Sequence, residues 1–230
     1  MTSLVIATRN AHKASEIRAI LPAQFRILTL DNFPAAPAVI EDAPTFAGNA
    51  SKKAVQLARW LARPGSGFTT QGSDTGFVLA DDSGLEVDAL NGAPGIHSAR
   101  FAALDKSANS PDADNNAKLL RLLKDVPLEK RAARFRCVLA LTPIAPTPAS
   151  GASPACAADE LELLTELFDG TCEGRIGLAP TGQGGFGYDP LFLPDGHQQS
   201  FAELGEATKN QISHRAQALA KLRARLEARV

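Results

Sequence analysis

The sequence predicts an α/β fold built around a mixed β-sheet. Residues 4–7 form a short apolar run typical of a buried strand, a helical pattern follows it, and residues 26–30 indicate a second strand. Strand candidates in the middle of the chain follow one another as antiparallel pairs do, so we expect a mixed sheet. With 230 residues and 44% apolar composition, the chain suits one α/β domain, in one lobe or two, or two small domains.

The first half of the chain contains two helical patterns. In the first, apolar residues recur on one face until Pro22 interrupts the pattern. The second covers about 46–63, where Thr45 is a suitable N-cap and small or apolar residues recur at helical spacing. The segment 64–76 is rich in Gly, Ser and Thr, which predicts a surface loop.

The middle of the chain predicts strands on either side of one helix. Residues 77–80 and 85–90 indicate two strands, separated by Asp81-Asp82-Ser83-Gly84. A helix is expected over 112–124 and a long strand over 132–142.

The last third begins with a low-complexity segment at 143–158, which we expect to be a flexible insertion between paired strands. Residues 160–168 and 174–178 give weaker strand signals. Leucines on one face then predict a final helix over about 213–228.

Composition narrows the class of function. The chain has 24 basic and 25 acidic residues, whereas a dedicated nucleic-acid binder normally has a basic excess, so we expect a small-molecule substrate and no nucleic acid. Its three cysteines lack a CxxC pair, which argues against a disulfide framework or a zinc site. No apolar run approaches a membrane span or a signal peptide, so we expect a cytoplasmic protein with no membrane partner.

The first polar constellation lies between the first predicted strand and the first predicted helix. It consists of Thr8, Arg9, Asn10, Ala11, His12 and Lys13. Ligands bind at the carboxyl ends of strands and helix N-termini favour anions, so Thr8 and Asn10 are candidates to bind phosphate oxygens that Lys13 neutralises. Alternatively, Thr8 or Asn10 caps the helix and Lys13 is solvated. The segment is not a Walker loop, so its position leaves both interpretations open.

The second constellation is the acidic stretch Asp81-Asp82-Ser83-Gly84, flanked by apolar strands. Two carboxylates at a strand end can hold a hard divalent cation, which stabilises phosphate charge and activates a bound water. The alternative is an ordinary Asp-Ser-Gly turn. Glu41 is a further acid in a loop, where a surface charge is the default interpretation.

The third constellation is the glycine-rich stretch 182–190, GQGGFGYDP. It matches GxGxxG literally, but Pro190 and an extended apolar run follow where a dinucleotide-binding helix would begin. The glycines instead allow a ligand to approach the backbone closely, and Phe186 or Tyr188 offers an aromatic face to a base. A tight turn with both aromatic rings in the core is the alternative.

The fourth constellation surrounds the start of the last predicted helix. Ser213 is a suitable N-cap, and Lys209, His214 and Arg215 supply donors that can converge on a ligand. The structural interpretation is a cap with solvated basic residues.

Taken together, these segments resemble the inosine triphosphate pyrophosphatase family, including the bacterial RdgB-like dITP/XTP pyrophosphatases. The resemblance extends from residue 7 to residue 219 in the family's motif order. The matching stretches are ATRNAHKASEI, EDAPTFAGNASKKA, ADDSGLEVDALNGAPGIHSAR, GFGYDPLF and ISHRAQAL.

The resemblance implies a long mixed sheet with flanking helices, folded as a single domain over 1–230 whose two lobes form a nucleotide cleft. It implies a homodimer. It also implies a Mg²⁺-dependent enzyme that hydrolyses ITP, dITP and XTP to the monophosphate and pyrophosphate.

The resemblance also assigns roles to the candidate residues. Asp82 is expected to accept a proton and, with Glu41, to hold Mg²⁺, while Lys53 is expected near the phosphates. The segment Thr8 to Lys13 is expected to bind the triphosphate. The remaining substrate-site residues are Ser83, Phe186, Gly187, Tyr188, Asp189, Lys209, His214 and Arg215.

Two departures from the family pattern stand out. Gly48 occupies a position where family members commonly carry Glu, which removes one acid near the predicted site. The loops at 64–76 and 143–158 are longer than is typical, and we expect both to lie away from the chemistry.

Overall fold

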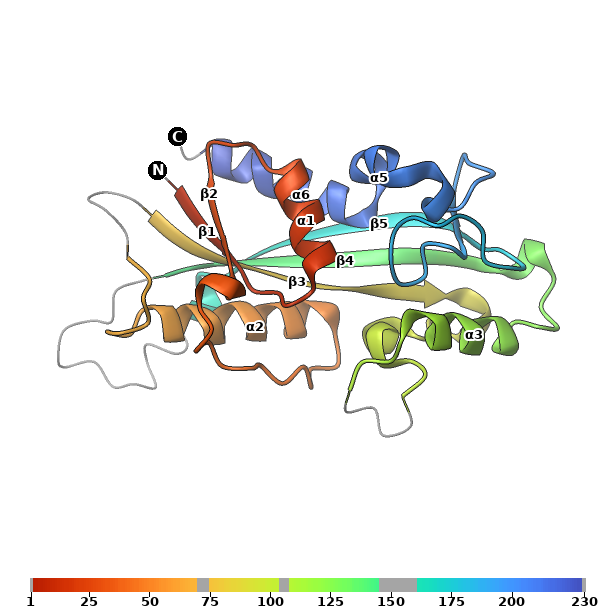
Figure 1. The fold of residues 1–230 in the computed structure, drawn as a ribbon, viewed down its shortest axis with the longest axis horizontal. Helices are drawn as coiled ribbons and strands as arrows, with labels where there is room; N and C mark the ends of the chain where they lie inside the picture. The colour runs from red at the N-terminus through yellow and green to blue at the C-terminus, as the bar shows by residue number, and fades with distance from the viewer. Residues whose placement is uncertain (1, 70–74, 104–107, 145–160, 229–230) are drawn as a thin grey trace. The chain divides into compact units, whose positions relative to one another are not determined.

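The computed structural model describes residues 2–69, 75–103, 108–144 and 161–228. These residues contain a six-stranded sheet with the strand order β2-β1-β3-β4-β5-β6 (Figure 1). The strands are β1 (Thr2–Ile6), β2 (Arg26–Thr29), β3 (Thr75–Val87), β4 (Ala132–Pro143), β5 (Glu166–Ile176) and β6 (Phe192–Pro194). The main helices are α1 (Ala11–Ile20), α2 (Phe46–Leu61), α3 (Asp112–Leu122), α5 (Phe201–Ile212) and α6 (His214–Glu227). Because β1 runs parallel to β2 and β3 while β6 runs antiparallel to β5, the predicted mixed sheet is confirmed.

The chain divides into two compact units. The first comprises residues 1–82, 138–168 and 222–230, and the second comprises residues 83–137 and 169–221.

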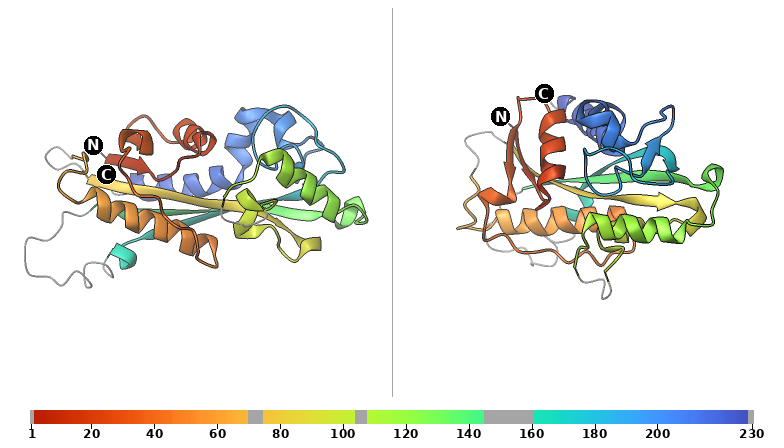
Figure 2. Two further views of the ribbon diagram at one scale, coloured as in Figure 1. Left: turned by 60° about the horizontal axis from the view of Figure 1, so that its bottom comes forward. Right: turned by 45° about the vertical axis from the view of Figure 1, so that its right-hand side comes forward.

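The first unit contains the parallel part of the sheet. Val5 of β1 pairs with Leu28 of β2 on one side and with Val78 of β3 on the other. The helices α1 and α2 lie on opposite faces of these strands (Figures 1 and 2), so a strand between them is covered on both sides. Accordingly, Leu4, Val5 and Ile6 are fully buried, which is why this segment is continuously apolar.

The helix α2 forms as its sequence pattern predicts. Thr45 is the N-cap, and its hydroxyl oxygen accepts a hydrogen bond of 3.0 Å from the Gly48 amide. The apolar stripe is buried along its length, through residues Ala50, Ala54, Leu57, Ala58 and Leu61.

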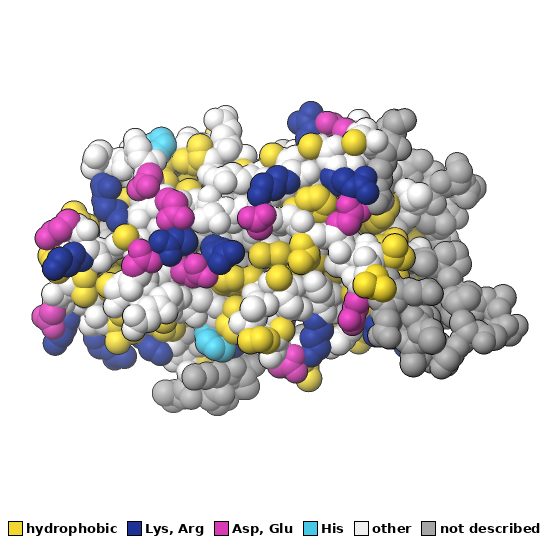
Figure 3. Space-filling model, turned by 180° about the vertical axis from the view of Figure 1, so that it is seen from behind, with side chains coloured by type: hydrophobic (Ala, Val, Ile, Leu, Met, Phe, Trp, Pro, Cys, Tyr) yellow, Lys and Arg dark blue, Asp and Glu magenta, His cyan; other side chains and the backbone are white. Residues whose placement is uncertain are grey.

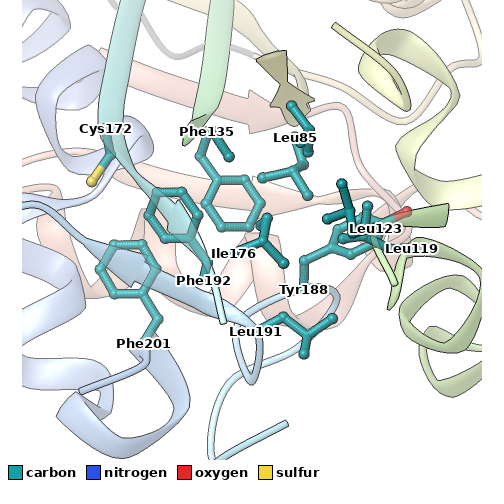
Figure 4. Packing of buried hydrophobic residues seen from close by; sticks show 12 residues of the cluster. Leu85, Leu119, Leu123, Phe135, Cys172, Ile176, Tyr188, Leu191, Phe192 and Phe201 are labelled. Atoms are coloured by element: carbon teal, nitrogen blue, oxygen red, sulfur yellow. The ribbon is translucent and has the colours of Figure 1, made fainter. Parts of the chain in front are cut away.

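The second unit has its own core, which Figure 4 shows. The ring of Phe135 on β4 lies 4.7 Å from that of Phe192 on β6, and Phe192 lies 5.3 Å from Phe201 of α5. Leu119 of α3 is fully buried in the same cluster. This core therefore joins strands β4 and β6 to helices α3 and α5.

A buried cation fixes the connection between α3 and β4. Arg131 is 4% exposed, and its guanidinium donates hydrogen bonds to the backbone carbonyls of Leu123, Val126 and Gly177. These carbonyls replace the water that the charge loses on burial, which makes the position tolerable for an arginine.

Three predictions about the elements are corrected. The two strands predicted at 77–80 and 85–90 are one, because β3 runs without interruption from Thr75 to Val87, which also excludes the alternative of an Asp-Ser-Gly turn. The two weak strand signals at 160–168 and 174–178 both overlap one strand, β5 (Glu166–Ile176), whereas residues 161–163 are helical. The helix α5 was not predicted, although Ser200 and Glu203 form a capping box at its start.

The two long loops are only partly described. Of the segment 64–76, residues 70–74 lie outside the described residues and β3 already begins at Thr75. The insertion predicted at 143–158 lies almost entirely outside them, because 145–160 are not described.

The described helices are all too short or too polar to cross a membrane. On the face drawn in Figure 3, basic and acidic side chains of the described residues are interspersed, in keeping with the formal net charge of −1.

Candidate active site

The first group of candidate residues, here called the acid–lysine cluster, consists of Lys13, Glu41, Lys53, Asp81 and Asp82, all in the first unit. Successive residues of a strand point to opposite faces of the sheet. Asp81 accordingly forms an ion pair with Lys13 of α1, whereas Asp82 contacts Lys53 of α2. The predicted pairing of the two carboxylates around one ligand is therefore replaced by one acid on each face.

Lys53 is the centre of the acid–lysine cluster. Its Nζ lies 3.3 Å from Asp82 Oδ1 and 3.4 Å from Glu41 Oε1, and it donates a 2.7 Å hydrogen bond to the carbonyl oxygen of Asp81. The Lys53 side chain is 11% exposed, whereas that of Glu41 is 36% exposed. Glu41 is thus held beside Asp82 by the Lys53 ammonium group that both carboxylates contact, while it remains partly open to solvent.

Asp82 has the electrostatic character of a reactive group. Its side chain is 9% exposed, and Oδ2 is buried with no hydrogen-bond partner among the described residues. Burial raises the pKa of the Asp82 carboxyl above its ordinary value, and the charges of Lys53 and Lys13 counteract part of that rise. A buried carboxylate with one uncommitted oxygen is suited to accept a proton or bind a cation.

The segment Thr8 to Lys13 forms the turn from β1 into α1. Asn10 is the helix N-cap, since its Oδ1 accepts a 3.1 Å hydrogen bond from the Lys13 amide, and Thr8 Oγ1 accepts one from the Asn10 amide. Arg9 donates to the carbonyl of Ala36. The cap expected at Asn10 is therefore confirmed, whereas Lys13 is paired with Asp81 and is not the solvated residue of that interpretation.

The same turn remains a candidate phosphate site. Arg9, Asn10, Ala11 and His12 are exposed, and the turn forms the N-terminus of α1. Lys13 belongs both to this turn and to the acid–lysine cluster, and its side chain is only partly buried beside Asp81.

The donor set of the acid–lysine cluster fits a hard divalent cation. The oxygens of Glu41 and Asp82 are the candidate ligands, and the buried Oδ2 of Asp82 lacks a partner among the described residues. No group of three or more His, Cys, Asp or Glu side chains gathers around a metal position in the part of the chain that is described. Two carboxylates match Mg²⁺, which usually completes its coordination with water and substrate phosphates.

The second group, here called the aromatic–basic cluster, consists of Ser83, Phe186, Asp189, Lys209, His214 and Arg215, all in the second unit. Lys209 and Asp189 form an ion pair in which the two side chains are 4% and 2% exposed. Asp189 Oδ2 also accepts a 2.8 Å hydrogen bond from the Phe186 amide. Lys209 Nζ in turn lies 4.4 Å from the centroid of the partly exposed Phe186 ring.

Two residues at the start of α6 complete this cluster. The Arg215 guanidinium is 1% exposed, donates a 2.9 Å hydrogen bond to Ser83 Oγ, and lies 6.0 Å from the centroid of the Phe186 ring. The His214 ring stacks on Phe135 at 4.8 Å. Ser213 caps α6 through a hydrogen bond from the Ala216 amide, as predicted.

The two aromatic candidates of the glycine-rich stretch have different positions. Tyr188 is 4% exposed, belongs to the core of the second unit (Figure 4), and donates a 2.9 Å hydrogen bond to the Ser98 carbonyl. The environment of Tyr188 is therefore that of an anchor, which leaves Phe186 as the ring available to a ligand.

Several supporting residues were missed by sequence reasoning. Asn49 accepts a 2.9 Å hydrogen bond from the Ala43 amide and so holds the loop that carries Glu41. Asp112 and Asn116 contact the backbone of Gly187. All three are polar residues in the first turns of a helix, which is a common position for such residues. The only signal in the sequence is the four-residue spacing of Asp112 and Asn116, which places them on one helical face and predicts that they contact the same segment.

Comparison with known proteins identifies the family. The model of the Ham1 family matches residues 4–225. The chain is 45% identical to a dITP/XTP pyrophosphatase of Geobacillus kaustophilus, covering 96% of this chain and 93% of that protein. It is 41% identical to a dITP/XTP pyrophosphatase of Shouchella clausii, covering 99% and 98% respectively.

Solved structures agree with this result. A HAM1 protein from Coxiella burnetii is 34% identical with a TM-score of 0.75, and the match covers 99% of this chain and 100% of that one. A nucleoside-triphosphatase/dITP/XTP pyrophosphatase from Mycobacterium abscessus is 33% identical with a TM-score of 0.66, covering 96% and 98%. The family predicted from the five motifs is confirmed: the chain belongs to the Ham1 family.

Proposed function

We propose that this chain is a pyrophosphatase that hydrolyses ITP, dITP and XTP to the nucleoside monophosphate and pyrophosphate, and so removes non-standard purines from the nucleotide pool. Relatives that are 41% to 45% identical over nearly their whole length are dITP/XTP pyrophosphatases, which supports this substrate class. The observation that carries the proposal is the buried Asp82 carboxylate, with one oxygen uncommitted among the described residues and Lys53 and Glu41 beside it.

Glu41 and Asp82 are the proposed ligands of Mg²⁺. A divalent cation bound there supplies charge neutralisation to the phosphates. Lys53 holds the two carboxylates together, and its charge counteracts part of the rise in the pKa of Asp82 that burial causes.

The proposed reaction is attack of water on the α-phosphorus. A bond forms between the water oxygen and the α-phosphorus, and the bond to the oxygen that bridges to the β-phosphorus breaks. Asp82 accepts the proton of the attacking water, because burial makes its carboxylate a stronger base than an exposed aspartate. Lys13 and the turn Thr8 to Asn10 stabilise the negative charge of the leaving pyrophosphate.

The aromatic–basic cluster is the proposed binding site for the base. Phe186 is partly exposed and can stack on a purine ring. The donors of His214 and Arg215 match a 6-keto oxygen, whereas the 6-amino group of adenine would face them as another donor. Sites that depend on such hydrogen bonds reject the mismatched analogue by factors of up to about 10⁴–10⁵.

We further propose that the enzyme is a cytoplasmic homodimer. The resemblance to the family supports the dimer. Cys172 is a buried free thiol in the described structure, which fits a reducing compartment.

Pyrophosphate release from ITP, XTP, GTP and ATP, each with Mg²⁺ and with EDTA, tests the proposal. Fast release from ITP and XTP that EDTA abolishes, with GTP and ATP nearly untouched, is the expected result. Cleavage of dTTP or UTP derivatives in preference to ITP would point to a pyrimidine pyrophosphatase. Binding of ITP without cleavage would point to a nucleotide sensor.

A further inference from the structure

Four consecutive residues in the loop 186–189 are each held by a separate partner. The Phe186 amide donates to Asp189 Oδ2, and Asp189 is paired with Lys209. The Tyr188 hydroxyl donates to the carbonyl of Ser98. Gly187 has no side chain, so it is held through its backbone.

The peptide groups of Gly187 are bound on both sides by the start of α3. The Gly187 amide donates a 2.6 Å hydrogen bond to Asp112 Oδ2, and its carbonyl accepts a 3.0 Å hydrogen bond from Asn116 Nδ2. Asp112 and Asn116 are four residues apart in one helix and so lie on the same face. One helical face therefore supplies both an acceptor and a donor to a single glycine.

The backbone at Gly187 sets the direction of the neighbouring side chain. Gly187 has φ = 62°, in the left-handed region that other residues rarely adopt. A hydrogen bond to its amide fixes the plane of the 186–187 peptide, and this plane determines where the Phe186 side chain leaves the backbone. Without these contacts, the backbone at Phe186 would lose its anchor on α3. The amide contact with Asp189 and the cations of Lys209 and Arg215 near the ring would remain.

We propose that Asp112 and Asn116 are positioning residues for the Phe186 ring, and that α3 thereby takes part in binding the base. This inference rests on the proposed function, in which Phe186 stacks on the purine. The two residues act through the loop and carry no chemical role. Their loss weakens recognition of the base and leaves hydrolysis of a bound substrate intact.

The first pair of variants concerns Asp112. Asp112→Ala removes the acceptor, whereas Asp112→Asn keeps a carbonyl oxygen that can accept from Gly187 and serves as the conservative rescue. Asp114→Ala is the matched control, because Asp114 is an exposed acid in the same first turn and supports the helix dipole equally.

Asn116→Asp tests the other side of the glycine with almost no change in side-chain volume. An ionised aspartate only accepts hydrogen bonds, so it cannot replace the donor that Asn116 gives to the Gly187 carbonyl. Circular dichroism and thermal unfolding of each variant establish that the fold is retained.

The first measurement is the KM and kcat for ITP, together with inhibition by inorganic triphosphate, which has no base. Loss of one such hydrogen bond is expected to raise KM about five- to tenfold in Asp112→Ala and Asn116→Asp. We expect kcat to change less than about twofold, because the reacting groups are untouched. Inhibition by inorganic triphosphate should stay at its wild-type value, as should both parameters in Asp112→Asn and Asp114→Ala.

Hydrogen exchange of the ligand-free protein is the second measurement and does not depend on activity. The amides of residues 186–189 should exchange faster in Asp112→Ala and Asn116→Asp than in the wild type and in Asp114→Ala. Unchanged exchange in both variants would overturn the anchoring role, even if the wild type cleaved no nucleotide and the proposed function itself failed.

Two kinetic outcomes would also overturn the inference. An unchanged KM in folded Asp112→Ala and Asn116→Asp would show that α3 contributes to packing and has no part in binding the base. An equal loss of affinity for ITP and for inorganic triphosphate would indicate general damage to the protein, with no specific effect on the base.

Discussion

The two candidate clusters hold their acids in different ways. In the acid–lysine cluster, Asp82 has an oxygen that is uncommitted among the described residues and a neighbour, Glu41, that is partly open to solvent. In the aromatic–basic cluster, Asp189 Oδ2 receives both the Lys209 ammonium and the Phe186 amide, and the pair is almost completely buried. A carboxylate with an oxygen that accepts no hydrogen bond is available to bind a proton or a cation. A carboxylate whose hydrogen-bonding positions are occupied stabilises the structure around it.

The scaffolds of the clusters differ as well. Regular elements carry four of the five residues of the acid–lysine cluster, in which strand alternation sends Asp81 towards α1 and Asp82 towards α2, while Glu41 lies in a loop. The aromatic–basic cluster instead includes a loop, whose shape depends on backbone contacts at Gly187 and Tyr188. The first arrangement follows from secondary structure, and the second requires tertiary partners.

Replacing Asp82 should have the largest effect on function. Asp82→Asn removes the proposed base, so kcat for ITP should fall about 10²–10⁴-fold. Burial raises the pKa of Asp82, which means that ionisation of this group costs stability progressively as pH rises from the ordinary range of an aspartate. The variant should therefore unfold at a temperature no lower than the wild type, with an advantage that grows as pH rises from the ordinary range of an aspartate to the raised pKa of Asp82 and is constant above it.

The measurements are pyrophosphate release and thermal unfolding between pH 5 and 8. Asp88→Asn, which alters an exposed aspartate of the second unit, is the control and should keep its activity. A folded Asp82→Asn enzyme with wild-type turnover would remove Asp82 from the mechanism.

Breaking the buried pair of the aromatic–basic cluster should instead reduce stability. Lys209→Met leaves the Asp189 carboxylate buried without its cation, which typically costs about 3–5 kcal/mol. Lys221→Met breaks the ion pair with Asp169, whose side chains are 54% and 66% exposed, and should cost less than about 1 kcal/mol. Urea unfolding of both variants measures the difference, and equal losses would contradict the structural role of the buried pair.

Sequence patterns predicted most of the first unit because its elements depend on local rules. The strand at β1 and the helix α2 with its Thr45 cap follow from apolar periodicity and capping chemistry. The break predicted between two strands at Asp81-Asp82 was wrong, because two adjacent acids resemble a loop unless their partners, Lys13 and Lys53, are known. Those partners lie 68 and 29 residues away along the chain.

The second unit was harder to predict for the same physical reason. The loop 186–189 takes its shape from Asp112, Asn116 and Ser98. These residues are distant in sequence, and no local pattern indicates which segment they contact. Burial of Tyr188 likewise depends on the core that forms around it. The roles of the candidate residues towards a nucleotide stay predictions.

Removing the exposed ring of the aromatic–basic cluster should have an intermediate effect. Phe186→Leu keeps apolar volume but loses the flat face, and stacking of an aromatic ring on a base contributes about 1–3 kcal/mol. The KM for ITP should therefore rise about tenfold, with kcat nearly unchanged. Steady-state kinetics measures this split, and a large fall in kcat with no change in KM would show that Phe186 acts on the chemistry instead.

The smallest effect is expected where the chain departs from its family, at Gly48 in the first turn of α2. A Cβ at this position would lie 2.8 Å from Ala43 Cβ and 3.2 Å from Thr45 Oγ1, closer than ordinary van der Waals contact. Alanine is favoured over glycine in a helix by about 1 kcal/mol, which offsets part of the steric cost in Gly48→Ala. The net change in the free energy of unfolding should be less than about 1 kcal/mol.

In Gly48→Ala the new methyl group should displace Ala43 and the loop around it. This displacement should still affect the enzyme, because Ala43 lies two residues from Glu41 and its amide is bound by Asn49. A shift of Glu41 weakens one proposed Mg²⁺ ligand, so the Mg²⁺ concentration for half-maximal activity should rise about two- to fivefold. Ala47→Gly, at the adjacent helical position, is the control for helix propensity and should lower stability without changing the Mg²⁺ requirement. If Gly48→Ala left that requirement unchanged, the Glu41 loop would not depend on the close approach that glycine permits.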